Sequence, residues 1–264
     1  MSFFKDKVVW ITGASSGIGE ALALEFSKQG TRLVISARRE DELKRVAALT
    51  KLPDLDLMVL PFDLKDTSKA TSLTASVINK FGRIDILVNN GGMSQRAEME
   101  KTSIEIDRDL MEVNYFSAVN LTRAVLPYMK RQKSGHVIVI SSVAGKFGFY
   151  LRSGYSAAKH ALHGFFDSFR LETEKDGIKT LIVCPGKIKT NISLNAVTDK
   201  GAHGKMDPSH ENAMSAEECA TIILKAIQNN DEEILVGGKE LFAVKIKRFF
   251  PKWFGRIIRK QSPF

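Results

Sequence analysis

This sequence has few cysteines and no long apolar run. Its 264 residues include two cysteines, Cys184 and Cys219, in segments with strand and helix patterns. We therefore predict two core thiols in a reducing compartment rather than a disulfide framework. No run of about 18 uncharged apolar residues occurs, and residues 1–7 lead into an apolar strand without a signal-peptide pattern. We expect a soluble, cytoplasmic protein with at most a peripheral membrane contact.

The main body also lacks an excess of charge of either sign. The net charge is +9, of which residues 239–264 supply +7 through eight basic residues and one acid, Glu240. The remainder is nearly neutral, which excludes the broad basic surface typical of nucleic-acid-binding proteins. We expect no nucleic-acid partner and a separate role for residues 239–264, the C-terminal extension.

Short apolar runs alternate with longer amphipathic segments along most of the chain. Continuous Val, Ile and Leu runs separated by helices are typical of a parallel sheet covered on both faces, and right-handed crossovers make such a sheet doubly wound. We predict an α/β Rossmann fold with a seven-stranded sheet of order 3-2-1-4-5-6-7, in a single domain over residues 1–238. The predicted strands are 7–12, 32–36, 57–61, 84–88, 136–141, 180–184 and 233–236.

Two long helices and one long loop complete the predicted domain. One helix is expected to begin at a capping-box pattern, Thr102 to Glu105, and to continue to about Arg131. The other is expected over residues 153–176. Residues 186–214 lack periodicity and are too long for a passive connection, so we predict a mobile loop that covers the substrate.

A glycine-rich turn follows the first predicted strand. Gly13, Gly17 and Gly19 have the spacing TGxxxGxG and precede a predicted helix over residues 18–28. Glycines there permit a tight turn, and the free N–H groups of a helix N-terminus bind a pyrophosphate. Such a run alone is also typical of an ordinary turn, but its strand–turn–helix context favours a dinucleotide site.

The second predicted strand ends in Arg38 and Arg39, without the carboxylate that would hold the ribose 2′-hydroxyl of NAD. An arginine there can pair with a 2′-phosphate instead. We therefore predict NADP(H) as the cofactor, with Arg38 as the first partner of the phosphate and Arg39 as the second. The alternative is two solvated arginines at the start of a helix.

Tyr155 and Lys159 lie one helical turn apart, so the phenol and the ammonium can face one pocket. A tyrosine has an ordinary pKa of about 10, and a neighbouring cation lowers it by favouring the phenolate. Ser142 ends the fifth predicted strand upstream of this pair. Each residue alone has an ordinary structural explanation, but together they predict an acid–base site.

In this order the motifs resemble the short-chain dehydrogenase/reductase family over roughly residues 5–238. Asp63 with Leu64 matches the family's adenine-contacting position, residues 89–92 (Asn-Asn-Gly-Gly) resemble its NNAG segment, and Pro185-Gly186 with Thr190 resembles the segment that closes over the nicotinamide. Gly92 replaces the family's usual alanine, a small-for-small change expected to leave room for the cofactor. Residues 146–149, 153–161 and 189–193 resemble the dehydrogenase/reductase member 7 subgroup, near the 11β-hydroxysteroid dehydrogenase type 1-like enzymes.

The resemblance implies a catalytic tetrad of Asn114, Ser142, Tyr155 and Lys159. Tyr155 would exchange a proton with the substrate oxygen while Ser142 donates a hydrogen bond to it. Lys159 would lower the pKa of Tyr155 and hold the nicotinamide ribose, and Asn114 would anchor a water that links Lys159 to solvent. The predicted cofactor-binding residues are Gly13, Ser15, Ser16, Gly17, Ile18, Gly19, Arg38, Arg39, Asp63, Leu64, Asn90, Gly91, Gly92, Tyr155, Lys159, Pro185, Gly186, Ile188 and Thr190.

We expect an NADP(H)-dependent carbonyl reductase or secondary-alcohol dehydrogenase that acts on apolar, lipid- or steroid-like substrates, by analogy with the subgroup. The alternative is a catalytically silent NADP(H)-binding sensor or scaffold. The family also implies a homodimer or homotetramer through the two long helices. The residues that flank the motifs, and so are expected at the substrate pocket or its lid, are Met93, Phe147, Phe149, Tyr150, Ile192, Met206 and Met214.

No metal site is predicted. His160 and His163 share a helix face, but the sequence clusters no cysteine or carboxylate with them, and we interpret both as helix-surface histidines.

The C-terminal extension has an amphipathic pattern. Between residues 246 and 260, aromatic and aliphatic residues recur at three- and four-residue spacings with basic residues between them. Pro251 is suited to an early position of a short helix that ends near Lys260. Two interpretations stay open: an interfacial anchor on anionic lipid, or packing against the body or another subunit.

Overall fold

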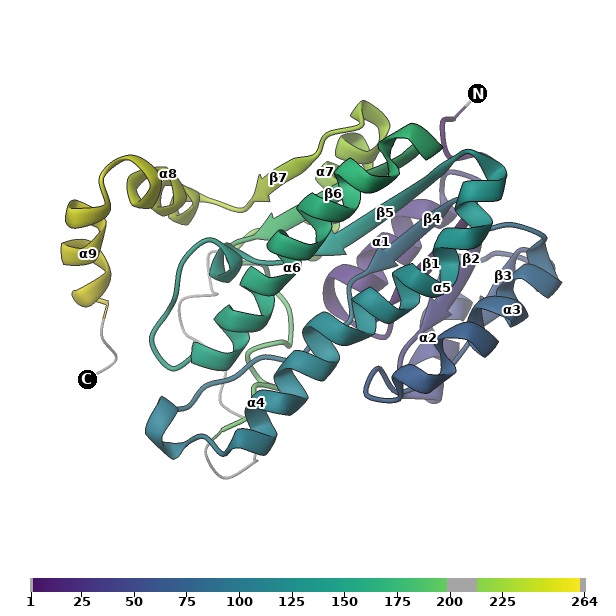
Figure 1. Cartoon of the computed structure of the whole chain (residues 1–264). Helices are drawn as coiled ribbons and strands as arrows, with labels where there is room; N and C mark the ends of the chain where they lie inside the picture. Colours follow the sequence, from purple (N-terminus) through teal and green to yellow (C-terminus); the bar gives the residue numbers. More distant parts are fainter. Residues whose placement is uncertain (1, 199–212, 262–264) are drawn as a thin grey trace.

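The computed structural model describes residues 2–198 and 213–261. Within these ranges seven parallel strands form one sheet of order β3-β2-β1-β4-β5-β6-β7 (Figure 1), which confirms the predicted doubly wound Rossmann fold. Only the strand ends differ from the predicted ranges. The strands are β1 (Val8–Thr12), β2 (Arg32–Ser36), β3 (Leu57–Val59), β4 (Ile86–Asn89), β5 (Gly135–Ile140), β6 (Ile178–Pro185) and β7 (Glu233–Val236).

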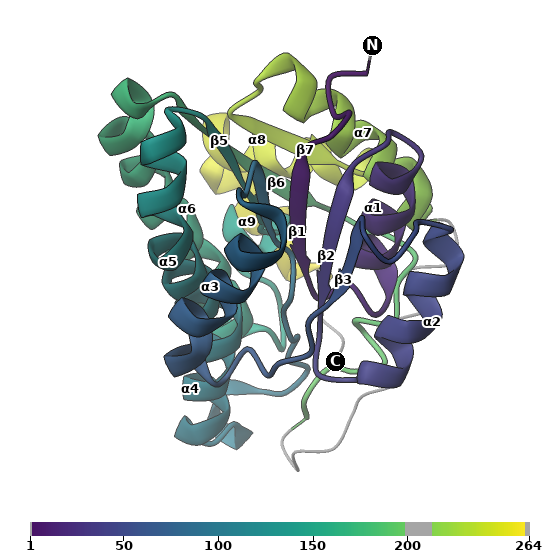
Figure 2. The ribbon, with the colours of Figure 1, turned by 90° about the vertical axis from the view of Figure 1, so that its right-hand side faces the viewer.

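Helices cover both faces of the sheet (Figure 2). One layer contains α1 (Gly17–Ser27), α2 (Glu40–Thr50) and α7 (Ala216–Asn229), and the other contains α3 (Ala70–Phe81), α5 (Ser117–Gln132) and α6 (Ser153–Thr173). Side chains alternate between the two layers along each strand: Val9 and Ile11 of β1 pack toward the first, whereas Val8 and Trp10 pack toward the second. Both faces are therefore apolar, as a parallel sheet requires.

Trp10 and the two cysteines belong to this core. The Trp10 side chain is fully buried, and its Nε1 donates a hydrogen bond of 2.9 Å to Ser36 Oγ on the neighbouring strand. Cys184 and Cys219 are free and buried, which confirms that they are core thiols.

The long helix predicted over residues 102–131 is in fact three segments. A π-helical turn, Glu112–Phe116, separates α4 (Ile104–Met111) from α5, and Asn114 lies in that turn. The predicted capping box at Thr102 does not form, because Ser103 is the N-cap and makes no side-chain capping bond. Short 3-10 turns cover Thr67–Lys69, Met99–Lys101, Val143–Gly145, Glu174–Asp176 and Lys239–Leu241.

The C-terminal extension forms α8 (Phe242–Phe249) and α9 (Pro251–Arg259), which project past β7 (Figure 1). Pro251 is in the first turn of α9, as predicted. No helix within the described ranges is long and apolar enough to cross a membrane. Of the predicted substrate loop, residues 199–212 lie outside the described part, Met206 among them.

Candidate active site

One cleft of about 670 Å³ lies at the carboxyl ends of the strands. Parallel strands end at the same edge, so the loops that follow them meet there, which is where doubly wound sheets bind ligands. Every predicted cofactor-binding residue lines this cleft except Gly19, and Ser142, Tyr155 and Lys159 line it too. Asn114 does not.

Thr12 and Asn90 hold the ends of β1 and β4 together. Thr12 Oγ1 accepts hydrogen bonds from the backbone N–H groups of Asn90 (3.0 Å) and Gly91 (3.1 Å). Asn90 Nδ2 in turn donates to the carbonyl oxygens of Thr12 (2.9 Å) and Gly13 (3.2 Å). These bonds fix the glycine-rich turn against the loop after β4, and the cleft opens between the two.

Three glycines make this approach possible. Gly13 has φ +64°, and a Cβ there would lie 2.6 Å from Gly91 Cα. A Cβ on Gly19 would lie 2.3 Å from the Gly13 carbonyl oxygen, so Gly19 acts from behind the cleft by letting α1 approach the turn. These glycines carry no side chain that would cover the backbone in the turn that begins α1. Its N–H groups are therefore accessible to a pyrophosphate.

Arg38 and Arg39 line the cleft where β2 ends, and both are exposed. Neither forms an ion pair with any residue in the described ranges. Arg45 on α2 is instead neutralised by Glu20 and Glu42. Two cations without an ion pair among the described residues therefore face the cleft, and positions 37–39 at the end of β2 carry no carboxylate.

Tyr155 and Lys159 project from α6, and both are buried at the inner wall of the cleft. Lys159 Nζ donates a hydrogen bond of 2.9 Å to the Ile140 carbonyl and lies 5.8 Å from the centre of the Tyr155 ring. Ser142 lies two residues after β5 and caps the 3-10 turn Val143–Gly145, where its Oγ accepts a bond from the Ala144 backbone N–H (3.1 Å).

Burial controls the protonation of this pair. It raises the pKa of Tyr155 above its ordinary value, although the Arg152 charge and the Ser142 hydroxyl act in the opposite direction. It also lowers the pKa of Lys159 to about 8. The expectation that Lys159 lowers the pKa of Tyr155 is wrong, because desolvation disfavours both charged forms and the ammonium donates to the Ile140 carbonyl.

Gln95 positions the start of α6, and no motif in the sequence points to it. Its fully buried Oε1 accepts hydrogen bonds from the backbone N–H groups of Gly154 (2.9 Å) and Tyr155 (3.3 Å). Its Nε2 donates to Thr102 Oγ1 at 3.0 Å. Since the helix's own N-cap, Arg152, makes no side-chain capping bond, Gln95 satisfies free N–H groups of the turn that carries Tyr155.

This geometry agrees with comparisons to known proteins. A family model described as short chain dehydrogenase matches residues 7–201. The chain belongs to the short-chain dehydrogenase/reductase family. It is 47% identical over 236 residues to "Dehydrogenase/reductase SDR family protein 7-like" of Anopheles gambiae, which covers 87% of this chain and 74% of the relative. It is 41% identical over 266 residues to "Dehydrogenase/reductase SDR family member 7" of Homo sapiens, which covers 97% and 78%.

These relatives confirm the predicted family and its member 7 branch. Among solved structures, a short chain dehydrogenase/reductase of Burkholderia phymatum in complex with NAD superposes with a TM-score of 0.85 at 21% identity, covering 100% of this chain and 98% of that one. At that identity the likeness concerns the fold alone.

Asn114 lies behind the cleft of this dehydrogenase/reductase, next to the position where it departs from the family pattern. Its Nδ2 donates to the carbonyl oxygens of Met93 (3.0 Å) and Leu110 (2.9 Å), and its Oδ1 accepts from the Met93 N–H (3.2 Å). A Cβ on Gly92 would lie 2.7 Å from that Oδ1 and 3.6 Å from Lys159 Nζ. The glycine at position 92 thus makes room for Asn114, a consequence that the sequence did not reveal.

The predicted substrate-pocket residues separate into two groups. Met93 and Ile192 line the cleft, whereas Phe147, Phe149, Tyr150 and Met214 do not. Phe147 is buried and packs on Phe149 and on Phe254 of α9, with ring centres 4.7 and 4.8 Å apart. The sequence also missed lining residues on α4 and the π-helical turn, which are Ile106, Asp109 and Val113.

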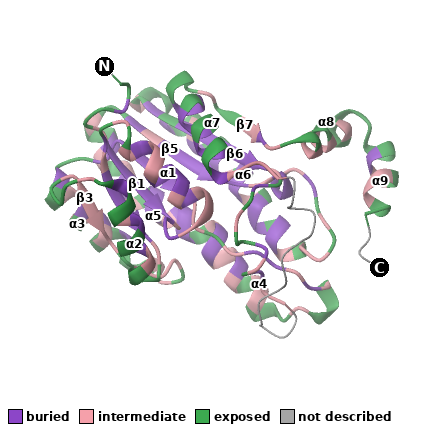
Figure 3. Cartoon of the chain, turned by 180° about the vertical axis from the view of Figure 1, so that it is seen from behind, coloured by how far each residue is buried: buried purple, intermediate pink, exposed green. Residues whose placement is uncertain are grey.

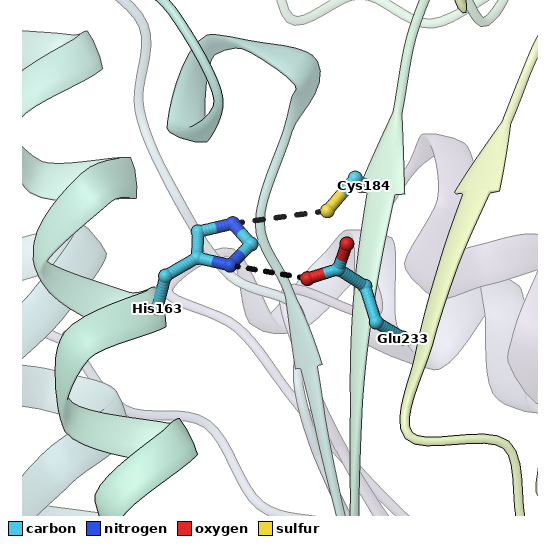
Figure 4. Close-up of side chains that lie close together, drawn as sticks. All are labelled: His163, Cys184 and Glu233. Atoms are coloured by element: carbon cyan, nitrogen blue, oxygen red, sulfur yellow. Dashed lines mark hydrogen bonds and ion pairs between the residues drawn. The ribbon is translucent and has the colours of Figure 1, made fainter. Parts of the chain in front are cut away.

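His163 is buried, so its interpretation as a surface histidine is wrong, and a cysteine and an acid do lie beside it (Figure 4). Its Nε2 lies 3.7 Å from Cys184 Sγ, while its Nδ1 faces Glu233 Oε2 at 3.5 Å. Helix and strand residues far apart in the sequence supply this cluster, which is why spacing gave no sign of it. His160 is exposed, as predicted.

The cluster is better explained as a hydrogen-bonded group than as a metal centre. Cys184 and Glu233 face different nitrogens of the ring, whereas ligands must converge on one ion. Lys146 Nζ already neutralises Glu233 at 2.5 Å. Burial raises the pKa of Cys184 to about 12, so the thiol is protonated near neutral pH and is a poor ligand.

Gly92→Ala restores the family's usual residue, yet we expect it to be unfavourable here. The added methyl group would displace Asn114 from its three hydrogen bonds, which corresponds to a loss of about 1–3 kcal/mol in the free energy of unfolding. Thermal unfolding and kcat/KM measure the effect. The control is Gly164→Ala on α6, where a Cβ meets nothing within 4 Å. Unchanged stability and activity in Gly92→Ala would contradict the packing described above.

Proposed function

We propose that this chain is an NADP(H)-dependent oxidoreductase that transfers a hydride between the nicotinamide and a carbonyl or secondary alcohol of an apolar, lipid- or steroid-like substrate. The observation that carries the proposal is that Ser142, Tyr155 and Lys159 line the same cleft as the glycine-rich turn. An acid–base group and a bare helix N-terminus are thereby placed in one continuous site.

The residues present fit a dinucleotide. Added side-chain atoms on Gly13 or Gly91 would fill the floor of the cleft, since a Cβ on Gly91 would lie 2.3 Å from Leu64 Cδ1. A Cβ on Gly17 would lie 3.0 Å from Thr190 Cγ2, so the loop after β6 reaches across to the start of α1. The bound cofactor supplies or accepts the hydride at C4 of its nicotinamide.

The chain's own residues handle the proton and the developing charge. In reduction, the Tyr155 hydroxyl donates a proton to the substrate oxygen and the Ser142 hydroxyl donates a hydrogen bond to it. Lys159, at the inner wall of the cleft, holds the nicotinamide ribose. Asn114 fixes the backbone at Met93 through its hydrogen bonds. In this position it would also anchor a water that links Lys159 to solvent.

NADP(H) is supported by the unpaired cations at the end of β2. Arg38 and Arg39 are exposed at the cleft without an acidic partner among the described residues. Because the Burkholderia phymatum relative was solved with NAD, family membership alone does not select the cofactor. The arginines support NADP(H), since a guanidinium pairs with a 2′-phosphate and has no such partner in NAD.

An apolar substrate is supported by the surroundings of Tyr155. Met93 and Ile106 pack against the cluster that contains Tyr155, and both line the cleft. Val113 and Ile192 add further apolar surface to the lining. A substrate carbonyl held at Tyr155 would thus carry its hydrocarbon part against these side chains.

We also propose a cytoplasmic protein in peripheral contact with an anionic membrane surface through residues 246–260. The exposed side chains of Phe249, Phe250 and Trp253 (67%, 61% and 54%) lie among the basic residues of α8 and α9. Figure 3 shows exposed and intermediate residues along α8 and α9, with one buried turn in α9. That turn carries Phe254, which is buried against Phe147. The extension therefore packs on the body through Phe254, while Phe249, Phe250 and Trp253 stay exposed.

Self-association through α4, α5 and α6 belongs to the same proposal. Ile104, Phe116 and Leu171 expose 57%, 43% and 76% of their surface on or at the ends of these helices. Apolar side chains in such positions favour a homodimer or homotetramer.

Tyr155→Phe should lower kcat/KM for carbonyl reduction by about 100-fold or more, because the ring is retained and the transferable proton is lost. The Kd for NADPH should not change. Tyr115→Phe is the matched control, since Tyr115 lies outside the cleft lining. Activity within a few-fold of the original would refute the mechanism, and tight NADPH binding without turnover of any carbonyl in the original chain would favour the silent sensor.

Arg38→Ala should raise the KM for NADPH by about 10- to 100-fold, the value of a hydrogen bond to a charged group, and should leave the KM for NADH unchanged. Arg39→Ala should have a smaller effect. Lys44→Ala, which removes an exposed cation of α2 already paired with Glu40, serves as the control. A preference of the original chain for NADH would overturn the choice of cofactor.

Vesicle sedimentation tests the membrane contact. The chain should pellet with phosphatidylserine-containing vesicles but not with pure phosphatidylcholine, and added salt should weaken the binding. Phe250→Ala with Trp253→Ala should reduce binding by about tenfold or more, since each side chain is worth about 1.5–3 kcal/mol when buried. Leu55→Ala, at a remote residue that is 84% exposed, is the control. If the Phe250→Ala/Trp253→Ala variant pellets as much as the Leu55→Ala control, the proposed membrane contact is wrong.

A further inference from the structure

The loop after β6 is held at the cleft by a side chain from the C-terminal extension. Pro185, Gly186, Ile188 and Thr190 line the cleft. The N–H of Gly186 donates to the Val236 carbonyl at 2.8 Å, as a continuation of the sheet. The next N–H, that of Lys187, has no strand partner and donates to Glu240 Oε1 at 2.8 Å.

The space around this carboxylate is shaped by two glycines. A Cβ on Gly186 would lie 2.3 Å from Glu240 Oε1, and a Cβ on Gly237 would lie 2.5 Å from it. The same oxygen accepts a second hydrogen bond, of 3.0 Å, from the Gly238 N–H. Gly186 therefore leaves room on the side away from the cleft, where the carboxylate is inserted.

Glu240 is ionised in this position and is the only acid of residues 239–264. Burial raises the pKa of its carboxyl, but the backbone N–H groups of Lys187 and Gly238 outweigh that effect, and the net pKa lies below the ordinary value. Its hydrogen bonds are therefore charge-assisted, and bonds of this kind are roughly twice as strong as neutral ones.

The extension has a second attachment to the same site. Phe254 of α9 packs on Phe147, in the loop that follows Ser142. Ser142 Oγ itself donates to the Pro185 carbonyl at 3.4 Å. The extension thus contacts two segments next to the predicted catalytic serine, one after β5 through Phe254 and one after β6 through Glu240.

We propose that Glu240 is a positioning residue that holds Gly186 to Ile188 in place for the nicotinamide half of the cofactor, which makes the C-terminal extension part of the cofactor site. The inference rests on the proposed use of NADP(H). If Glu240 has this role, deletion of residues 239–264 would also disturb the cleft. Point variants of the exposed residues of the extension therefore test membrane contact more cleanly than a truncation.

The test is the Kd for NADPH of the full chain, measured by calorimetry. Glu240→Ala should raise the Kd by about tenfold, because an ordered loop segment is released. Glu240→Gln retains an acceptor oxygen and should restore most of the affinity, whereas Glu240→Asp is too short to reach Lys187 and should not. Lys239→Ala, in the same turn, should bind as the original does.

A purely structural role would lower the melting temperature and the fraction of active protein without changing the Kd. Loss of the negative charge alone would strengthen binding of an anionic cofactor, which is opposite to the expected direction. Unchanged affinity in Glu240→Ala, or equal weakening in the Ala and Gln variants, would overturn the inference. If Glu240→Ala does not fold, the Gln and Asp variants decide by the same criterion.

Failure of the proposed function gives a different result. In that case the original chain would not bind NADPH, or would bind it without turning over any carbonyl. If the original binds NADPH and the Glu240 variants bind equally well, only the positioning role is wrong.

Discussion

The contact between Thr12 and Asn90 is the constraint on which the site depends. It joins the ends of β1 and β4, where the order of the sheet reverses and helices leave on opposite faces. A cleft exists at that point because the two loops diverge beyond the contact. A Cβ on Gly13 would meet the backbone of Gly91, and one on Gly91 would meet the Leu64 side chain. The backbone geometry of the two loops therefore forms the cleft, and the side chains of Ser142, Tyr155 and Lys159 line its wall.

Much of the fold and of the site could be predicted from the sequence, because both depend on local sequence patterns. Strand and helix periodicity gave the sheet order, and the fixed spacing of the glycines and of Tyr155 with Lys159 placed them together. Gln95 and His163 were not readable, since their partners are distant in sequence and are brought near only by the fold. The π-helical turn at Asn114 was missed because it interrupts a pattern that is otherwise helical.

Burial has opposite effects on two groups of charges below the cleft. At the inner wall burial lowers the pKa of Lys159 and raises that of Tyr155, and the Arg152 charge does not offset its effect on the tyrosine. Around His163 the effect of direct contacts on the pKa exceeds that of burial. Hydrogen bonds from His163 and Lys146 lower the pKa of Glu233 to about 2. The ionised Glu233 thus stays paired with Lys146 and in contact with His163, where α6 meets the sheet.

The chain has two tryptophans, and the fold places them in opposite environments. Trp10 lies in the centre of the sheet with its indole N–H bound to Ser36, whereas Trp253 is exposed on α9. Their fluorescence therefore reports on two separate processes. Emission from the first is shielded from aqueous quenchers until the sheet opens, while emission from the second responds to whatever covers the extension. One spectrum, recorded with and without iodide, separates global unfolding from events at the C-terminal surface.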